Sequence, residues 1–216
     1  MDRSQFWNAV YTEKADGDLS WYQARSTFIP RILERVALPK EAAVLDVGGG
    51  GPSAFVDDLL GRGYTEVSVL DVSRAALERC QQRLGECARS VTWLEADITR
   101  FVPPRRYDFW HDRAAFHFLT APEDQQAYFA ALARGLKVGG WALLATFAPE
   151  GPPRCSGLEV CRWSPEALLR ALGDAYVLED SFRETHRTPW EVSQVFACGL
   201  FRRVREQAAR ATGASR

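Results

Sequence analysis

Short apolar segments alternate with segments of helical periodicity along most of the chain. Buried parallel strands are predicted from apolar runs bounded by glycine, proline or polar residues, at 43–47, 66–70, 91–95, 106–110 and 141–147. Helices are predicted from apolar residues three and four positions apart, at 25–40, 53–61, 74–84 and 120–137. Ser73 is a suitable N-cap, and Thr120 with Glu123 has the spacing of a capping box. The alternation indicates an α/β fold: a doubly wound, mostly parallel sheet with helices on both faces.

The pattern changes after the fifth predicted strand. A short helix is predicted to begin at Ser164 and to end at Gly173, and strand-like runs follow at 176–182 and 195–203. A polar loop separates these runs, so we expect a C-terminal antiparallel hairpin that completes a seven-stranded sheet. The predicted parts of the chain are an N-terminal helical lid segment (1–40), a main domain (41–204) and a flexible tail (205–216).

Composition and charge restrict the classes of function. The 216 residues are 46% hydrophobic, and 27 Lys plus Arg against 28 Asp plus Glu leave a net charge of -1. These values are typical of a globular protein and supply no basic excess for binding nucleic-acid phosphates. No stretch approaches the ~20 apolar residues of a membrane span, and the five cysteines form no C-x-x-C pair. We therefore expect a cytoplasmic protein that acts on small molecules or proteins, and neither nucleic-acid nor membrane binding.

A glycine-rich turn follows the first predicted strand, at residues 48–51, and carboxylates lie at the ends of three successive strands. These carboxylates are Asp46, Asp71 and Asp97. In doubly wound sheets, ligands bind at the carboxyl ends of the strands, and glycines allow the backbone to approach a ligand closely. A carboxylate after the second strand is well placed to accept hydrogen bonds from ribose hydroxyls, and one after the third can meet an adenine amino group. The arrangement predicts a site for an adenosine-containing cofactor.

With these motifs the sequence resembles the class I S-adenosylmethionine-dependent methyltransferases, over about residues 43–203. The motifs are Val-Leu-Asp-Val-Gly-Gly-Gly-Gly (44–51), Val-Leu-Asp-Val-Ser (69–73), Leu-Glu-Ala-Asp-Ile (94–98), Tyr-Asp-Phe-Trp (107–110) and Leu-Lys-Val-Gly-Gly-Trp-Ala-Leu-Leu (136–144). The resemblance implies S-adenosylmethionine as cofactor, with the glycine turn against its methionine part. The residues that we expect to bind the cofactor are Asp46, Gly48, Gly49, Gly50, Asp71, Val72, Asp97, Ile98 and His111. Pro52 stands where the family has its third glycine, and NAD is disfavoured because the turn lacks the last glycine of the dinucleotide fingerprint.

The N-terminal segment is rich in aromatic residues. Trp7 and Tyr11 lie one helical turn apart, and Trp21 and Tyr22 follow before the first core helix. These rings either pack a capping helix onto the fold or form a lid over the cofactor, since aromatic faces attract a sulfonium cation and a lid excludes water. The segment resembles that of thiol methyltransferases and of lysine methyltransferases, in which it closes over the cofactor. We accordingly include all four residues in the predicted cofactor site.

The end of the fourth strand supplies the candidate catalytic residues. His111 and Asp112 are suited to deprotonate or orient the methyl acceptor. Arg113 is suited to bind a substrate carboxylate or to pair with Asp112, and His117, between two phenylalanines, is a candidate substrate contact or a core histidine. The residues that we expect to contact substrate are Arg113, His117, His186 and Trp190. No metal is expected, because the histidines lack thiolate or carboxylate partners at ligand spacing.

The sequence thus predicts a methyltransferase that uses S-adenosylmethionine and acts on a small-molecule acceptor, for which a thiol is one candidate. A protein lysine methyltransferase is the alternative, favoured by the N-terminal resemblance. A cofactor-binding regulator without chemistry of its own is the third interpretation, and the polar residues after the fourth strand argue against it.

Overall fold

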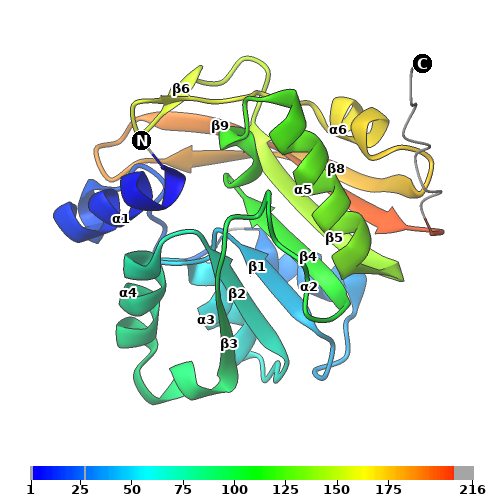
Figure 1. The fold of residues 1–216 in the computed structure, drawn as a ribbon, viewed down its shortest axis with the longest axis horizontal. Coiled ribbons are helices and arrows are strands. Elements are labelled where there is room, and N and C mark those ends of the chain that lie inside the picture. Colours follow the sequence, from blue (N-terminus) through cyan, green and yellow to red (C-terminus); the bar gives the residue numbers. More distant parts are fainter. Residues whose placement is uncertain (1, 27, 207–216) are drawn as a thin grey trace, which may run out of the picture.

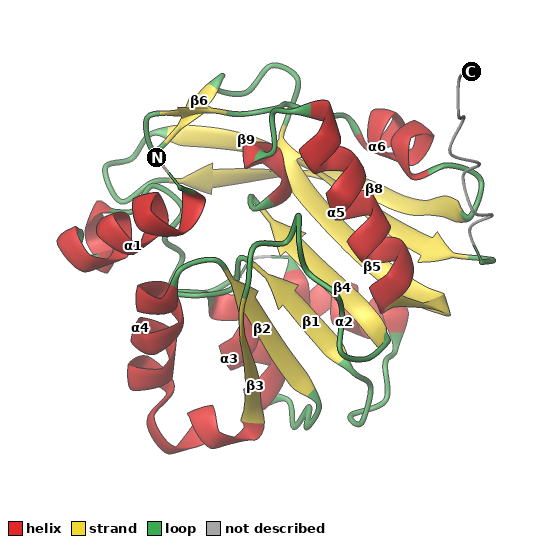
Figure 2. Cartoon of the chain, in the orientation of Figure 1, coloured by secondary structure: helices red, strands yellow, loops and turns green. Residues whose placement is uncertain are grey.

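A seven-stranded sheet forms the centre of the molecule and separates two layers of helices (Figures 1 and 2). The computed structural model describes residues 2–26 and 28–206. The strands, in their spatial order, are β3 (Val91–Glu95), β2 (Val67–Asp71), β1 (Val44–Val47), β4 (Tyr107–Arg113), β5 (Leu136–Phe147), β9 (Ser193–Arg203) and β8 (Tyr176–Arg187). The first five are parallel, and β9 is antiparallel to both of its neighbours. The predicted doubly wound sheet with a C-terminal antiparallel hairpin is confirmed.

Helices cover both faces of this sheet. The α-helices are α1 (Arg3–Glu13), α2 (Ile29–Val36), α3 (Ala54–Gly61), α4 (Arg74–Leu84), α5 (Pro122–Gly135) and α6 (Pro165–Leu172). Side chains alternate between the faces along each strand, so Val44 packs under α2, α3 and α4, whereas Leu45 packs under α5 and α6. The central strand β1 is therefore buried on both sides.

Shorter elements complete the fold. They are the 3-10 helices η1 (Asp16–Asp18), η2 (Gly85–Ser90) and η3 (Phe116–Phe118), and a two-stranded sheet of β6 (Arg154–Cys155) and β7 (Leu158–Glu159) in the connection after β5. The small sheet has no counterpart in the sequence prediction, because two-residue strands leave no periodic pattern. Helix α1 lies beside α4 at the end of the sheet where β1 and β2 terminate (Figure 1).

β5 begins at Leu136 and not at 141 as predicted, and two other strands run at least three residues beyond their predicted C-terminal ends. β4 continues through His111 and Asp112, which pair with β1 on one side and β5 on the other. β8 continues to Arg187, so most of the predicted polar loop is strand and the turn is confined to 188–192. In both strands, the polar residues are held by backbone hydrogen bonds to neighbouring strands and by side-chain partners. A strand prediction that relies on runs of apolar residues does not detect such polar extensions.

Helix ends agree with the sequence at some positions and differ at others. Ser73 caps α4 by accepting a hydrogen bond from the backbone N–H of Ala76, as predicted. The capping box at Thr120 is wrong, since α5 begins after Ala121 and no side chain caps it. The predicted helix 25–40 is shorter than expected, because Ala37 adopts a left-handed conformation and ends α2. The predicted tail beyond Glu206 lies outside the described residues.

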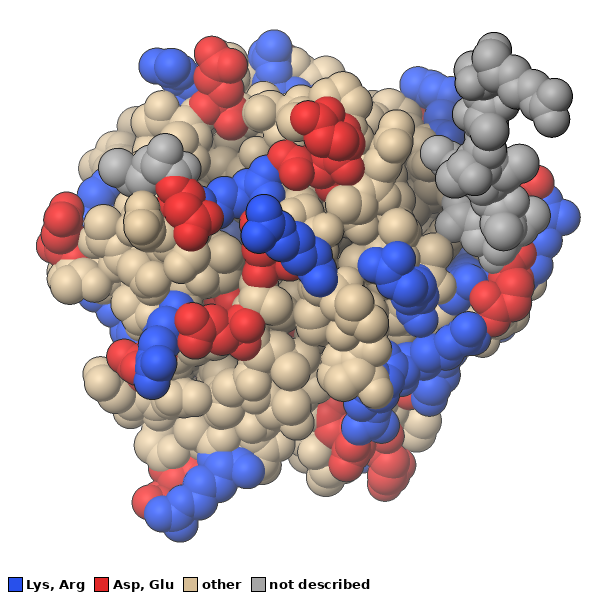
Figure 3. All heavy atoms as spheres, viewed as in Figure 1, with Lys and Arg blue, Asp and Glu red and all other residues tan. Residues whose placement is uncertain are grey.

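The surface carries both signs of charge. On the face shown in Figure 3, Lys and Arg side chains alternate with Asp and Glu across broad neutral areas, as the balanced composition suggests. Among the helices of the described residues, none is long and apolar enough to cross a membrane.

Candidate functional site

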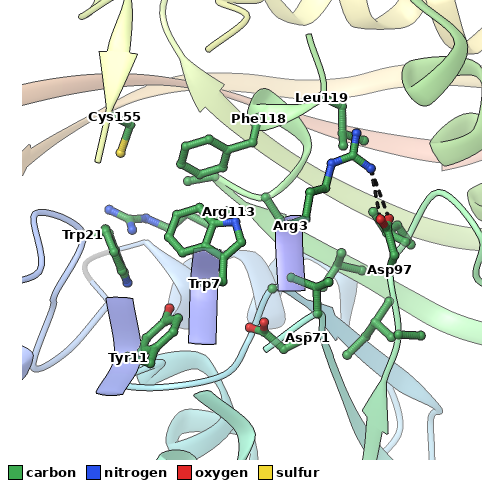
Figure 4. A pocket seen from close by; sticks show the side chains of 18 of the residues that line it. Arg3, Trp7, Tyr11, Trp21, Asp71, Asp97, Arg113, Phe118, Leu119 and Cys155 are labelled. Carbon is green, nitrogen blue, oxygen red and sulfur yellow. Dashed lines mark hydrogen bonds and ion pairs between the residues drawn. The ribbon is translucent and has the colours of Figure 1, made fainter. Parts of the chain in front are cut away.

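A cavity lies at the carboxyl ends of β1, β2 and β4, and α1 forms one of its walls (Figure 4). Its polar side chains include two carboxylates near strand ends and two arginines, and its other walls combine aromatic and aliphatic side chains. The sequence-predicted residues that line it are Trp7, Tyr11, Trp21, Gly48, Asp71, Val72, Asp97, Ile98 and Arg113. Residues from six separate segments of the sequence therefore meet in one place.

The glycine turn after β1 fits tightly between strand and helix. Gly48 has a φ of +69°, which favours glycine, and its N–H donates to the carbonyl of Leu70 at 2.7 Å. A Cβ at Gly50 would lie 2.6 Å from the Cβ of Ala76 and 2.8 Å from Oδ2 of Asp71. Glycine is required at these positions because a side chain would displace the neighbouring helix or the carboxylate.

Asp71, the last residue of β2, lies at the floor of the cavity. Its Oδ1 accepts from the N–H of Ser73 at 2.8 Å and its Oδ2 from the N–H of Gly50 at 3.1 Å. The side chain is buried, and burial raises the pKa of Asp71 to about 6. Backbone donors from two loops thus fix the orientation of a carboxylate that borders the cavity.

Asp97 lies at one end of the cavity, in the loop after β3, and is held by Arg3 from α1. Arg3 Nη1 is 3.0 Å from Asp97 Oδ2, and Thr99 donates to Oδ1 through both its N–H and its hydroxyl. Burial alone would raise the pKa of Asp97, but the hydrogen bonds from Thr99 and the charge of Arg3 lower it. Sequence reasoning missed Arg3, because a single basic residue near the N-terminus carries no pattern.

The aromatic residues of the N-terminal segment form one wall of the cavity. The Trp7 ring centroid lies 5.7 Å from that of Trp21 and 4.9 Å from that of Phe118, and Tyr11 and Trp21 are 6.0 Å apart. Tyr22 belongs to the apolar cluster behind this wall and lines neither cavity. Trp7, Tyr11 and Trp21 therefore both pack α1 onto the fold and line the cavity.

A second, smaller cavity adjoins the first on the other side of the glycine turn. Gly48, Gly49 and Gly50 line it together with His111, and Trp21, Val47, Gly48 and Arg113 border both cavities. His111 Nδ1 is 2.6 Å from Oδ1 of Asp46, whose Oδ2 accepts from the hydroxyl of Ser53. The His111 ring also packs on the ring of Phe55, with 4.0 Å between the two ring centroids. His111 is therefore buried against Asp46 and does not line the larger cavity.

Asp112 projects to the opposite face of the sheet. Its carboxylate accepts from the N–H groups of Ala115 and Phe116 and from the hydroxyl of Tyr128 at 2.8 Å. The residue is buried, which raises the pKa of Asp112 to about 6, and it lines neither cavity. The geometry does not support the prediction that Asp112 is catalytic, because its oxygens are occupied in holding the turn after β4.

Arg113 pairs with a residue that sequence reasoning did not connect to it. Its Nε donates to Oε2 of Glu184 at 3.2 Å, and Glu184 Oε1 accepts from the side chain of Gln23 at 2.7 Å. The guanidinium carbon lies 4.5 Å from the ring centroid of Phe196. The alternative of a pair with Asp112 is wrong, because successive residues of β4 point to opposite faces.

Three predicted substrate contacts lie away from both cavities. His117 is buried between the rings of Phe118 and Phe147, and burial lowers the pKa of His117 to about 3. His186 Nε2 lies 2.6 Å from the carbonyl of Ser20, and Trp190 is 52% exposed in the hairpin turn. These positions do not support the expectation that His117, His186 and Trp190 contact the substrate.

The larger cavity is lined instead by residues that the sequence analysis did not select. Gln194 and Phe196 of β9, Phe118, Phe147 and Cys155 line the larger cavity. Gln194 directly precedes the predicted apolar strand 195–203. This position was the signal that could have placed Gln194 beside the cavity, because alternate residues of a strand project to the same face. Within residues 2–26 and 28–206, no three His, Cys, Asp or Glu side chains are grouped as metal ligands would be.

Comparisons with known proteins found a matching family model and several relatives. A family model described as a methyltransferase domain matches residues 44–140. A malonyl-[acyl-carrier protein] O-methyltransferase of Anoxybacillus flavithermus is 30% identical over 68% of this chain, which spans about half (54%) of that protein's length. EEF1A lysine methyltransferase 2 of Danio rerio is 23% identical over 82% of this chain and 76% of its own length.

Solved structures share the fold. A structure from a study of the conversion of a disulfide bond into a thioacetal group during echinomycin biosynthesis has a TM-score of 0.73, with 20% identity over 96% of this chain and 94% of that chain. Several other structures with this fold were determined with S-adenosylhomocysteine or sinefungin bound.

Proposed function

Because the chain carries a methyltransferase domain on the fold of the class I S-adenosylmethionine-dependent methyltransferases, we propose that it transfers the methyl group of S-adenosylmethionine to a small-molecule acceptor. The observation that carries the proposal is the composition of the larger cavity. The carboxylates of Asp71 and Asp97 lie on its strand-end side, and the aromatic side chains of α1 line it elsewhere (Figure 4). Phe196 of β9 adds a further aromatic ring. One cavity therefore offers groups for an adenosyl cofactor and apolar space for a second molecule.

The residues at the strand ends fit the cofactor. Asp71 presents a fixed carboxylate for the ribose hydroxyls, and Asp97 with Ile98 borders the space for the adenine. Gly48 has no side chain and borders the cavity, so the cofactor can approach its backbone closely. S-adenosylmethionine supplies a methyl group that is activated on a sulfonium, and the faces of Trp7, Tyr11 and Trp21 are suited to attract that cation.

The chain's own residues mainly position the acceptor. Because a sulfonium is already a good leaving group, holding the acceptor in line with the methyl group supplies most of the rate effect. We propose that residues 1–40, including α1, act as the lid that excludes water from this space. The enclosed aromatic walls favour a small acceptor, and a thiol remains one candidate within this class.

A protein lysine methyltransferase is the second candidate. The N-terminal aromatic segment and the similarity to EEF1A lysine methyltransferase 2 favour it. The acceptor end of the cavity opposes it, because the guanidinium of Arg113 would repel a lysine ammonium group. Two assays with labelled cofactor separate the candidates. Label transferred to whole-cell protein would favour the lysine methyltransferase, and label transferred to small metabolites would favour the small-molecule enzyme.

The proposal is tested in two steps. Calorimetry with S-adenosylhomocysteine should show binding, and Asp71→Ala should weaken it by about 1–3 kcal/mol through loss of the ribose acceptor. The exposed variant Glu78→Ala on α4 is the control and should bind normally. A panel of thiols, phenols, carboxylic acids and amines should then yield a methylated product for at least one class. Absence of any binding by the cofactor or its product would overturn the proposal.

A further inference from the structure

We propose that the methyl acceptor is a planar aromatic or heteroaromatic molecule that binds as an anion, with its negative group on Arg113 and a hydrogen-bond donor directed at Gln194. This inference rests on the proposed function and specifies its substrate class. It follows from two buried polar atoms that have no partner, from the residues around them, and from the distribution of charge along the cavity.

Arg113 is held in a fixed orientation with one edge left unused. Glu184 binds it through Nε and is itself held by Gln23, and the guanidinium rests on the ring of Phe196. The Arg113 side chain is only 12% exposed, yet its Nη2 has no hydrogen-bond partner among the described residues. Buried donors are nearly always paired, so the free edge of this guanidinium is suited to receive an oxygen, sulfur or nitrogen anion.

Gln194 provides the second unpartnered group. The residue is 8% exposed, and its Oε1 is buried with no hydrogen-bond partner in the described part of the chain. Gln194 and Phe196 are two positions apart on β9 and therefore project to the same face, and both line the cavity with Arg113. Arg113 and Gln194 both border the space, so we assign them as one hydrogen-bond donor and one acceptor toward a molecule that binds there.

The walls of this region favour a flat molecule. The cavity is lined here by Trp21, Phe118, Phe147 and Phe196, whose rings provide faces and edges for stacking. In Figure 4, Arg113 lies on the side of Trp21 and Cys155, and Asp97 lies at the opposite end. The acceptor region is thus separate from the strand-end carboxylates that we assign to the cofactor.

Among the described residues that line this region, none has a side chain that readily takes a proton. Its titratable groups, apart from the arginine, are Tyr11 and Cys155, and burial raises the pKa of both, so they remain protonated and neutral. His111 lies in the other cavity against Asp46. An acceptor that arrives as an anion needs no base: its lone pair forms the bond to the methyl carbon as the sulfur–carbon bond breaks, and that electron pair returns to sulfur. An acceptor with an ammonium group would be repelled by Arg113, and no base in this region would remove its proton.

The test measures binding of small probes to the complex with S-adenosylhomocysteine by calorimetry. Benzoate, benzamide and benzylamine have the same ring with a negative, neutral and positive group. We expect benzoate to bind at least ten-fold more tightly than benzylamine. In the double variant Arg113→Met with Glu184→Met, which leaves no buried charge unpaired, this preference should disappear. Equal binding of the two probes, or an unchanged preference in the double variant, would overturn the inference.

Two further variants make the assignment specific. Arg154→Gln removes an exposed arginine next to Cys155 that does not line the cavity, and it should leave the preference for benzoate unchanged. At least one hydroxybenzoate isomer should bind about five-fold more tightly than benzoate, and Gln194→Met should abolish that gain. No gain for any isomer would exclude the role of Gln194. Failure of S-adenosylhomocysteine itself to bind the unaltered protein would instead overturn the proposed function.

Discussion

Arg3 Nη1 lies 3.0 Å from Oδ2 of Asp97 and so joins the first turn of α1 to the loop after β3. The second terminal nitrogen of the same guanidinium pairs with Asp124 in α5. Three segments that are far apart in the sequence are thereby connected at the rim of the larger cavity, next to the space that we assign to the adenine. The pair connects the wall formed by α1 to the body of the sheet.

We predict that Arg3→Met accelerates release of S-adenosylhomocysteine. Because Arg3 is about one-third exposed, solvent weakens the pair to about 0.5–1 kcal/mol, which corresponds to a roughly two- to five-fold faster dissociation. Stopped-flow tryptophan fluorescence measures the rate. The control is Arg74→Met, which removes an exposed pair within α4 alone and should not change it. Equal rates for Arg3→Met and the unaltered protein would show that the pair does not restrain α1.

The packing of the glycine turn leads to a second prediction. Gly50→Ala should lower the free energy of unfolding by about 1–3 kcal/mol and strongly weaken cofactor binding, since its Cβ would collide with Ala76 and with the carboxylate of Asp71. Gly61→Ala is the matched control, because a Cβ there meets no atom within 4 Å and the residue ends α3. It should stabilise the protein by about 0.5–1 kcal/mol. Urea unfolding and calorimetry measure both effects, and a neutral Gly50→Ala would contradict the described packing.

Asp71 should make cofactor binding depend on pH. Burial raises its pKa from 3.8 to about 6, so the group's contribution to stability is fully present below pH 3.8 and is lost as pH rises through about 6. Cofactor binding has the opposite sign, because only the carboxylate accepts from two hydroxyls. Affinity for S-adenosylhomocysteine should therefore rise about ten-fold between pH 5 and pH 7. Asp71→Asn should give weaker binding that is flat over this range, and a pH-independent affinity in the unaltered protein would refute the assignment.

The sheet and much of the cofactor side of the site could be predicted from the sequence because they depend on local patterns. Apolar runs located β1 and β2, and a carboxylate directly after a strand must lie at the carboxyl edge of a parallel sheet. Asp71 and Asp97 accordingly lie where the spacing placed them, around the cavity. The glycine turn could be predicted equally well, because tight strand-to-helix turns need residues without a Cβ.

Apart from Arg113, the acceptor side could not be predicted, because it depends on which face of a strand each residue occupies and on long-range pairing. His111 and Asp112 are adjacent in the sequence, yet they project to opposite faces of β4. The partner of Arg113 is Glu184, 71 positions away, and no local pattern connects them. The hairpin contributes through Gln194 in its second strand, while its turn points away.

His111 provides the last prediction, because its contacts favour a structural role over the catalytic one that the sequence suggested. Its Nδ1 is bonded to buried Asp46 and its ring packs on Phe55, so His111→Ala should lower the free energy of unfolding by about 2–4 kcal/mol by leaving that carboxylate with Ser53 alone. With saturating cofactor and well below the unfolding midpoint, kcat should stay within about three-fold of the unaltered enzyme, since no step that we assign to the acceptor cavity uses the imidazole. His111→Gln, which can still donate to Asp46, should recover part of the lost stability. A His111→Ala protein that unfolds normally but loses more than a hundred-fold in kcat would establish His111 as the catalytic base and remove the argument that the acceptor arrives as an anion.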